Sequence, residues 1–138
     1  MTSRAKVSHD RNYGVLGTLE RAVMEVMWRK GEATVRDVLG AVGRKNGLAY
    51  TTIMTVMARL TEKGILQRTA SAGGSFVYRP RVSRDAFYAA ASRRLFSDLL
   101  REAGSVAIAP FVDAIEEVDP DQLAALRARL RRRGERTG

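Results

Sequence analysis

The side chains best suited to chemistry lie between residues 50 and 63, where hydroxyls and cations share one side of a predicted helix. Thr51, Thr52 and Thr55 fall on this side, and Arg59 and Lys63 follow further along. Threonine offers a hydroxyl and a methyl group, which can meet the polar edge of a base and the methyl of thymine. A guanidinium or an ammonium group can bind a phosphate. The pattern therefore predicts hydrogen bonding to a polyanion such as DNA.

Residues that usually perform catalysis or bind metals are scarce. The chain has no cysteine and one histidine, His9, which excludes thiol chemistry, a catalytic triad and histidine-based metal sites. The glycine motifs of phosphate-binding loops are missing from the sequence. The acidic pairs Glu116-Glu117 and Asp119/Asp121 stand near predicted helix ends, where solvation or capping explains them. We therefore expect no catalytic residues, no metal and no cofactor, and we predict that the protein is not an enzyme.

The charge of the chain is positive and unevenly distributed. The formal net charge is +9, from 24 lysines and arginines against 15 aspartates and glutamates. Residues 1–81 carry 14 basic against 6 acidic side chains, residues 82–126 carry 4 against 8, and residues 127–138 carry 6 against 1. A basic surface favours a polyanionic partner, whereas the acidic middle segment does not. We therefore expect a molecule in two parts, of which the first binds an anion.

Three helices and a hairpin are predicted to position the threonines. Apolar residues at helical spacing predict helices over residues 18–30, 34–42 and 50–63. Residues 65–69 and 76–79 are β-prone and are joined through a glycine pair, which predicts a β-hairpin. Helix, helix, helix and hairpin in this order make a winged helix-turn-helix domain.

Capping signals support these boundaries. Thr18 is a candidate cap for the first helix, and Thr34 with Asp37 resembles a capping box for the second. Gly31 and Gly64 follow the first and third helices, where glycine commonly ends a helix.

The winged-helix arrangement predicts how the third helix would be used. Its apolar side would pack on the first two helices through Ile53, Val56, Met57 and Leu60. Its polar side would then face the major groove, which is about 12 Å wide and admits one helix. We expect DNA contacts from this helix, starting at Tyr50 and ending at Lys63, and from Arg68 and Arg79 of the hairpin beside the flanking backbone.

The C-terminal half is predicted to be a three-helix dimerisation segment. Helices are expected over about residues 83–102 and 106–117, and a last one begins at Pro120 with Asp119 as its cap. These helices carry more apolar side chains than they can bury alone, which indicates an interface. The alternative is that they pack back on the winged domain of a monomer. The predicted dimerisation residues are Phe87, Leu95, Leu99, Phe111, Val112, Ile115, Leu123, Leu126 and Leu130.

Several stretches of the sequence resemble the BlaI/MecI family of penicillinase repressors. They are Gly17–Trp28, Ala49–Gly64 and Phe76–Pro80, which are similar to the family's opening helix, recognition helix and second wing strand. The resemblance implies a transcriptional repressor that binds a palindromic operator as a homodimer. It also implies control of β-lactam-responsive genes and a membrane-anchored sensor protease as a partner. The family's DNA contacts map onto Thr51, Thr52, Met54, Thr55 and Arg59.

The expected fold is mainly α-helical with a small β-hairpin, in three parts. Residues 1–13 form a flexible basic arm, 14–82 the winged-helix DNA-binding domain and 83–138 the helical dimerisation domain. No apolar stretch reaches the length of a membrane span, and no apolar run follows the basic residues of positions 1–12 as in a secretory signal, so we expect a cytoplasmic protein without membrane insertion. Two other functions are compatible with the residues: a non-specific architectural DNA-binding protein, and a protein-interaction module with a basic face.

Overall fold

The computed structural model describes residues 16–43 and 47–137. The predicted arm, residues 1–13, lies outside the described residues. The chain divides into two compact units, one ending at Arg94 and the other beginning at Leu95, and each is treated by itself below. No helix within the described residues is long and apolar enough to cross a bilayer.

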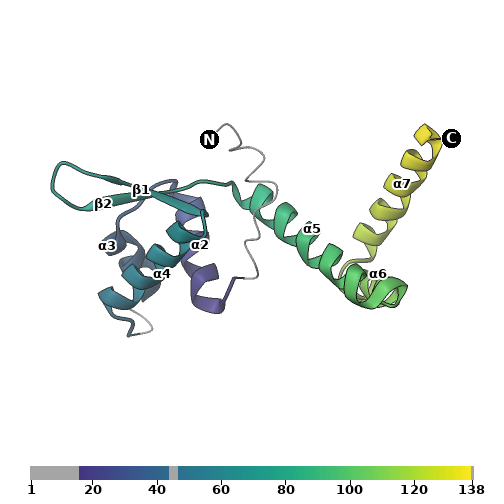
Figure 1. Ribbon diagram of the computed structural model, residues 1–138, viewed down its shortest axis with the longest axis horizontal. Helices are drawn as coiled ribbons and strands as arrows, with labels where there is room; N and C mark the ends of the chain where they lie inside the picture. The colour runs from purple at the N-terminus through teal and green to yellow at the C-terminus, as the bar shows by residue number, and fades with distance from the viewer. Residues whose placement is uncertain (1–15, 44–46, 138) are drawn as a thin grey trace. The chain divides into compact units, whose positions relative to one another are not determined.

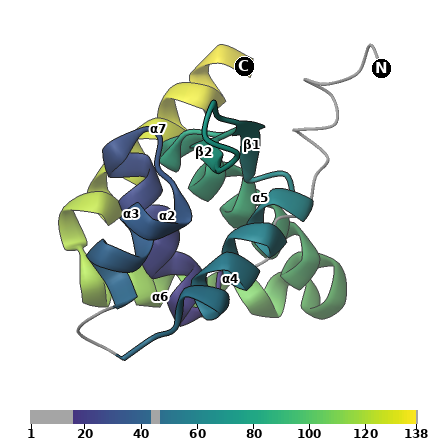
Figure 2. The same cartoon turned by 90° about the vertical axis from the view of Figure 1, so that its left-hand side faces the viewer.

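The first unit has the predicted order of three helical segments followed by a hairpin (Figure 1). The second helix is short and continues into a π-helical turn, η1, which the sequence did not predict. The elements are α2 (Thr18–Lys30), α3 (Val35–Val38), η1 (Leu39–Gly43), α4 (Tyr50–Glu62), β1 (Leu66–Ala70) and β2 (Phe76–Pro80). Helix α4 packs against both α2 and α3. Figure 2 shows these helices from the side toward which the loop of the hairpin points.

Side chains cap the helices largely as predicted. Asp37 accepts a hydrogen bond of 3.0 Å from Thr34 N–H, and Thr34 Oγ1 accepts one of 3.2 Å from Asp37 N–H, which confirms the capping box. These bonds hold the pKa of Asp37 below its ordinary value. The prediction for Thr18 was wrong: Thr18 is the first helical residue of α2 and Gly17 is the cap. Gly31 ends α2 with φ 83°, a conformation that glycine adopts without strain.

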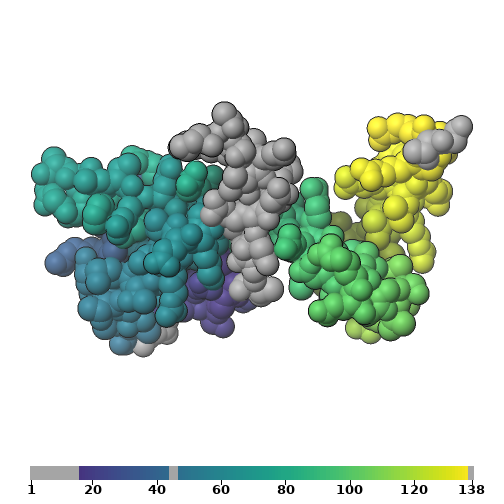
Figure 3. Space-filling model, viewed as in Figure 1, coloured from purple at the N-terminus to yellow at the C-terminus, as the bar shows by residue number. Residues whose placement is uncertain are grey.

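The hairpin is extended by a third short segment. Strands β1 and β2 pair antiparallel from Leu66 opposite Pro80 to Ala70 opposite Phe76. On its other edge β2 pairs with Ala33, through Ala33 N–H to Tyr78 O at 3.0 Å and Tyr78 N–H to Ala33 O at 2.9 Å. These bonds join the middle of β2 to the segment between α2 and α3, and the loop of the hairpin stands out in Figure 3.

One hydrophobic core holds the first unit together. All four apolar residues predicted for the inner side of α4 are buried, with Ile53, Met57 and Leu60 at 0% exposure. Met24, which the sequence pattern had not singled out, is also fully buried. The core therefore fixes α4 against α2 and leaves its opposite side in solvent.

The beginning of α5 (Arg84–Ala103) belongs to the first unit. Phe87 is 1% exposed, and its ring centroid lies 5.6 Å from the ring centroid of Trp28. Trp28 Nε1 donates a 2.9 Å hydrogen bond to Val82 O, and Arg84 pairs with Glu25 at 3.0 Å. The unit consequently extends past the predicted boundary at residue 82. Phe87 and Leu123 differ from the other predicted dimerisation residues, because their side chains are already buried within one chain.

The second unit consists of the end of α5, a 3-10 turn, and two further helices, α6 and α7. The 3-10 turn, η2, covers Gly104–Ala107 and is followed by α6 (Ile108–Val118) and α7 (Pro120–Thr137). Asp119 Oδ1 accepts a 3.2 Å hydrogen bond from Gln122 N–H, which confirms the predicted cap of the last helix. The ring centroids of Phe96 and Phe111 lie 4.8 Å apart, and Leu123 is buried at 5% exposure.

Candidate nucleic-acid interface

The outward side of α4 carries the residues that the sequence predicts to contact DNA. Thr51, Thr55 and Arg59 are exposed, and Thr52 is half-buried. Tyr50 and Met54 are 41% and 42% exposed, which is high for large apolar side chains on a helix that packs on a core. Because the other side of α4 is buried, this side is the part of the helix that can meet a ligand.

The hydroxyl of Thr55 is oriented by a hydrogen bond within α4. Thr55 Oγ1 donates a 2.9 Å hydrogen bond to Thr51 O, one helical turn earlier. A threonine hydroxyl has one proton and two lone pairs, so the exposed Thr55 can still accept a hydrogen bond. On DNA, Thr55 would therefore accept from an exocyclic amino group or contact the methyl of thymine.

The N-terminus of α4 favours negative charge. Its cap residue, Ala49, has no side chain that can bind the first N–H groups, and no acidic residue lies in the first turn. The N–H groups of a helix's first turn and the helix dipole give such an end a partial positive charge. A phosphate oxygen would be stabilised there in the usual manner.

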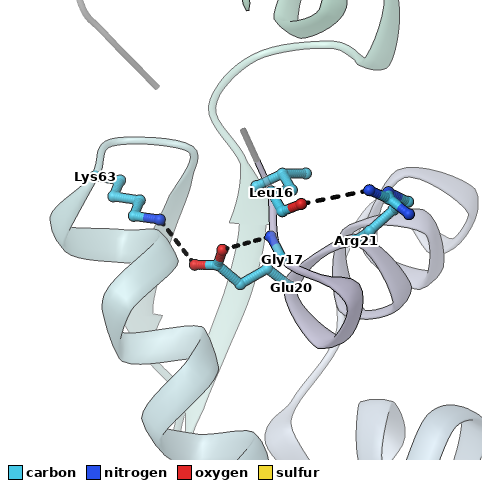
Figure 4. Close-up of polar contacts among 5 residues, drawn as sticks. All are labelled: Leu16, Gly17, Glu20, Arg21 and Lys63. Atoms are coloured by element: carbon cyan, nitrogen blue, oxygen red, sulfur yellow. Dashed lines mark hydrogen bonds and ion pairs between the residues drawn. The ribbon is translucent and has the colours of Figure 1, made fainter. Parts of the chain in front are cut away.

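Lys63 lies at the other end of α4 and is bound to α2. Its Nζ lies 2.8 Å from Glu20 Oε2, while Glu20 Oε1 accepts a 3.0 Å hydrogen bond from Gly17 N–H (Figure 4). Burial alone would raise the pKa of Glu20, but the two hydrogen bonds outweigh it, and the pKa lies below its ordinary value of 4.5. Lys63 therefore positions α4 as well as contributing charge, a role that the sequence pattern did not indicate.

The hairpin presents its two predicted arginines on different faces. Arg68 is paired with Tyr78 and Arg79 with Gln67, and adjacent strand positions point to opposite faces. The Arg68 guanidinium lies 4.2 Å from the Phe76 ring centroid. Arg79 pairs with Glu32 at 3.0 Å and donates to Thr69 Oγ1 at 3.3 Å. The structure thus does not bring the two arginines together, and a duplex that approaches one face of the hairpin meets only one of them.

Arg36 is a cation near the start of α4 that was missing from the predicted contacts. It is exposed on α3, and its guanidinium lies 5.7 Å from the ring centroid of Tyr50. The stacking keeps a positive charge beside the N-terminus of α4. The sequence signal was weak, because Arg36 is one of many basic residues and only the fold brings it to Tyr50.

A family model and a known protein sequence each match most of the chain. Residues 16–132 match the family model described as penicillinase repressor. The chain is 37% identical over 118 residues to the transcriptional regulator BlaI of Mycobacterium tuberculosis, strain CDC 1551 / Oshkosh, covering 83% of this chain and 82% of that protein.

Two solved structures are also similar to part of the chain. The solution structure of the DNA-binding domain of the repressor BlaI is 27% identical with a TM-score of 0.46, covering 51% of this chain and 85% of that one. A CopR repressor structure is 29% identical with a TM-score of 0.43, covering 50% of this chain and 99% of that one.

Proposed function

Since this chain belongs to the penicillinase repressor family, we propose that it is a transcriptional repressor whose helix α4 reads a specific operator in the major groove. One observation carries the proposal: α4 buries Ile53, Met57 and Leu60 completely and leaves Thr51, Thr55 and Arg59 exposed to solvent. A helix fixed in this way can enter a groove without losing its packing on the core.

The side chains along α4 suit different parts of the duplex. Thr51, Thr52, Met54 and Thr55 occupy the first half of the helix, whose N-terminal end commonly reaches base edges in helix-turn-helix proteins. Arg59 follows on the exposed side and would bind a backbone phosphate. Arg36 and the start of α4 would hold a second phosphate, and Arg68 would extend the contact along the hairpin.

We propose that the second unit joins two copies into a homodimer. Large apolar side chains of this unit are exposed, including Leu95 at 51%, Leu99 at 44%, Phe111 at 46% and Leu130 at 60%. Val112, Ile115 and Leu126 are half-buried beside them, whereas Leu123 is buried by its own chain. Exposed apolar surface of this kind favours association, and Phe87 is not part of the proposed interface.

A symmetric dimer fits a palindromic operator. Two α4 helices related by a two-fold axis would contact half-sites about 34 Å apart, one turn of DNA. Joining two weak half-site contacts increases affinity by about 10²–10⁴ through effective concentration. Any event that separates the second units would therefore release the operator.

The regulated genes and the release signal are inferred from the family. We propose that the protein acts in the cytoplasm on β-lactam-responsive genes, and that a membrane-anchored sensor protease ends repression. It would act by binding alone, without a cofactor or a catalysed reaction on the DNA.

Genome-wide mapping of bound DNA followed by a binding titration tests the function. The mapped site and a scrambled duplex of equal composition are titrated by fluorescence anisotropy over a range of salt concentrations. A repressor predicts a specificity ratio of about 10³ or more. Equal affinity for both duplexes with a steep salt dependence would instead identify an architectural DNA-binding protein. Negligible binding to either would leave the basic face as a protein-interaction surface.

A further inference from the structure

A hollow in the first unit lies away from the exposed side of α4. It has a volume of about 590 Å³ and is formed where α2 meets the chain that leads from β2 into α5. Its walls include the apolar side chains of Trp28, Pro80 and Val82 and the guanidinium-bearing side chains of Arg29, Arg81 and Arg84. Pockets that bind small molecules usually measure about 300–1,000 Å³.

The apolar wall of the hollow is fixed in place. Trp28 is half-buried, and its Nε1 donates a 2.9 Å hydrogen bond to Val82 O. The ring centroids of Phe87 and Tyr88 lie 5.6 and 5.9 Å from the ring centroid of Trp28. A rigid aromatic surface of this kind offers a flat apolar contact at little entropic cost.

The charge of the hollow is positive. Arg84 Nε donates to both oxygens of Glu25, at 3.0 and 3.1 Å, so these two charges compensate each other. Among residues 16–43 and 47–137, neither Arg29 nor Arg81 forms an ion pair, and both are exposed. Two guanidinium groups are thus available beside an apolar wall, and guanidinium binds carboxylates through paired hydrogen bonds.

We propose that this hollow binds a small organic carboxylate with an aromatic or aliphatic body. The body would lie against Trp28, Pro80 and Val82, and the carboxylate would accept hydrogen bonds from Arg81 and Arg29. The inference goes beyond operator binding and does not depend on it, since no residue of the hollow belongs to the exposed side of α4. The ligand would connect α2 to the start of α5 and stabilise that junction.

The single tryptophan of the chain allows a direct test. Full-length ¹⁵N-labelled protein gives one indole N–H signal, which reports on Trp28. Phenylacetate, hexanoate and 4-phenylbutyrate are titrated, with phenylacetamide as the uncharged counterpart of the first. We expect saturable shifts of the indole signal with the carboxylates and at least about tenfold weaker binding of phenylacetamide, because the charge-assisted hydrogen bonds are lost.

Arginine variants distinguish specific binding in the hollow from non-specific binding to the protein surface. Arg81→Gln and Arg29→Gln should each raise the Kd for the best carboxylate about tenfold and remove the increase in Tm that it causes. The matched control is Arg93→Gln, an exposed arginine of α5 outside the hollow, which should bind as the parent does. The proposal is overturned if no carboxylate gives a saturable shift, if phenylacetamide binds equally well, or if all three variants bind alike.

Discussion

Lys63 and Glu20, 43 residues apart in the sequence, are joined by a 2.8 Å ion pair that ties the C-terminal end of α4 to the N-terminal cap of α2. The Glu20 side chain is 16% exposed and that of Lys63 39%. The carboxylate also accepts from Gly17 N–H, so one acidic group orders the start of one helix and the end of another. Besides the hydrophobic core, this ion pair from α2 helps to fix the orientation of α4 and of the threonines that it exposes.

Replacing Glu20 should make stability less dependent on pH. The pKa of Glu20 is lowered in the folded chain, so its contribution is present above the unfolded pKa of 4.5 and is lost as the pH falls through the folded value. We expect Glu20→Gln to lower the free energy of unfolding by roughly 0.5–1 kcal/mol at pH 7, since the pair is partly exposed. Urea unfolding at pH 7 and at pH 3 measures the difference, which should be smaller at the lower pH.

Glu62→Gln is the matched control for this prediction, because Glu62 is an exposed carboxylate beside Lys63 in the sequence. Its stability should follow that of the parent at both pH values. A loss for Glu20→Gln that is as large at pH 3 as at pH 7 would show that the ion pair is not the cause.

Thr55→Val should reduce sequence preference. Valine keeps a methyl group at the exposed position but lacks the oxygen that can accept a hydrogen bond. We expect the affinity for the operator to fall by about 1–3 kcal/mol while the affinity for scrambled DNA is unchanged. Anisotropy titrations on both duplexes measure this, with Thr61→Val as a control, because Thr61 is half-buried and bonds to Met57 O at 2.8 Å. Equal losses on both duplexes would contradict a role in base reading.

Arg59→Gln should weaken binding to all sequences alike. A phosphate contact carries no sequence information, so the specificity ratio should remain that of the parent. The slope of log K against log salt should decrease by about two for the proposed dimer, because each copy loses one phosphate contact and the counterion released with it. The salt titration used for the parent protein measures both quantities. A change in sequence preference with an unchanged salt slope would place Arg59 at a base instead of the backbone.

Leu95→Lys should separate the proposed dimer. Leu95 is 51% exposed on α5, and a buried lysine without a partner is costly at an interface. We expect sedimentation velocity to show monomers at concentrations where the parent is dimeric, and operator affinity to fall by about 10²–10⁴. Ser92→Lys adds the same charge at an exposed position one turn earlier on α5 and should leave both measurements unchanged. Dimers that persist in Leu95→Lys would remove Leu95 from the interface.

Local features of the first unit could be predicted from the sequence because neighbouring residues determine them. The capping box of Thr34 and Asp37 depends on two residues three positions apart. The burial of Ile53, Val56, Met57 and Leu60 follows from helical spacing, and so does the exposure of Thr51 and Thr55. Such periodic and capping signals need no knowledge of the remaining chain.

Long-range contacts could not be predicted in the same way. The stripe of apolar residues on α5 has one spacing throughout, so nothing in the pattern indicates that Phe87 packs on Trp28 while Leu95 is exposed. The bonds between Lys63 and Glu20 and between Trp28 and Val82 join residues 43 and 54 positions apart. The π-helical turn at Leu39–Gly43 has likewise no signal in the local sequence. These features arise from tertiary packing, which overrides local propensity.

Chemical protection of the mapped operator tests most directly whether α4 reads the major groove. Dimethyl sulfate methylates guanine N7, which faces the major groove, and adenine N3, which faces the minor groove. We predict that the bound protein protects guanine N7 in two patches about 10 base pairs apart, and that Thr55→Val loses protection within the same patches. Protection confined to adenine N3, or an unprotected major groove in a saturated complex, would contradict the account.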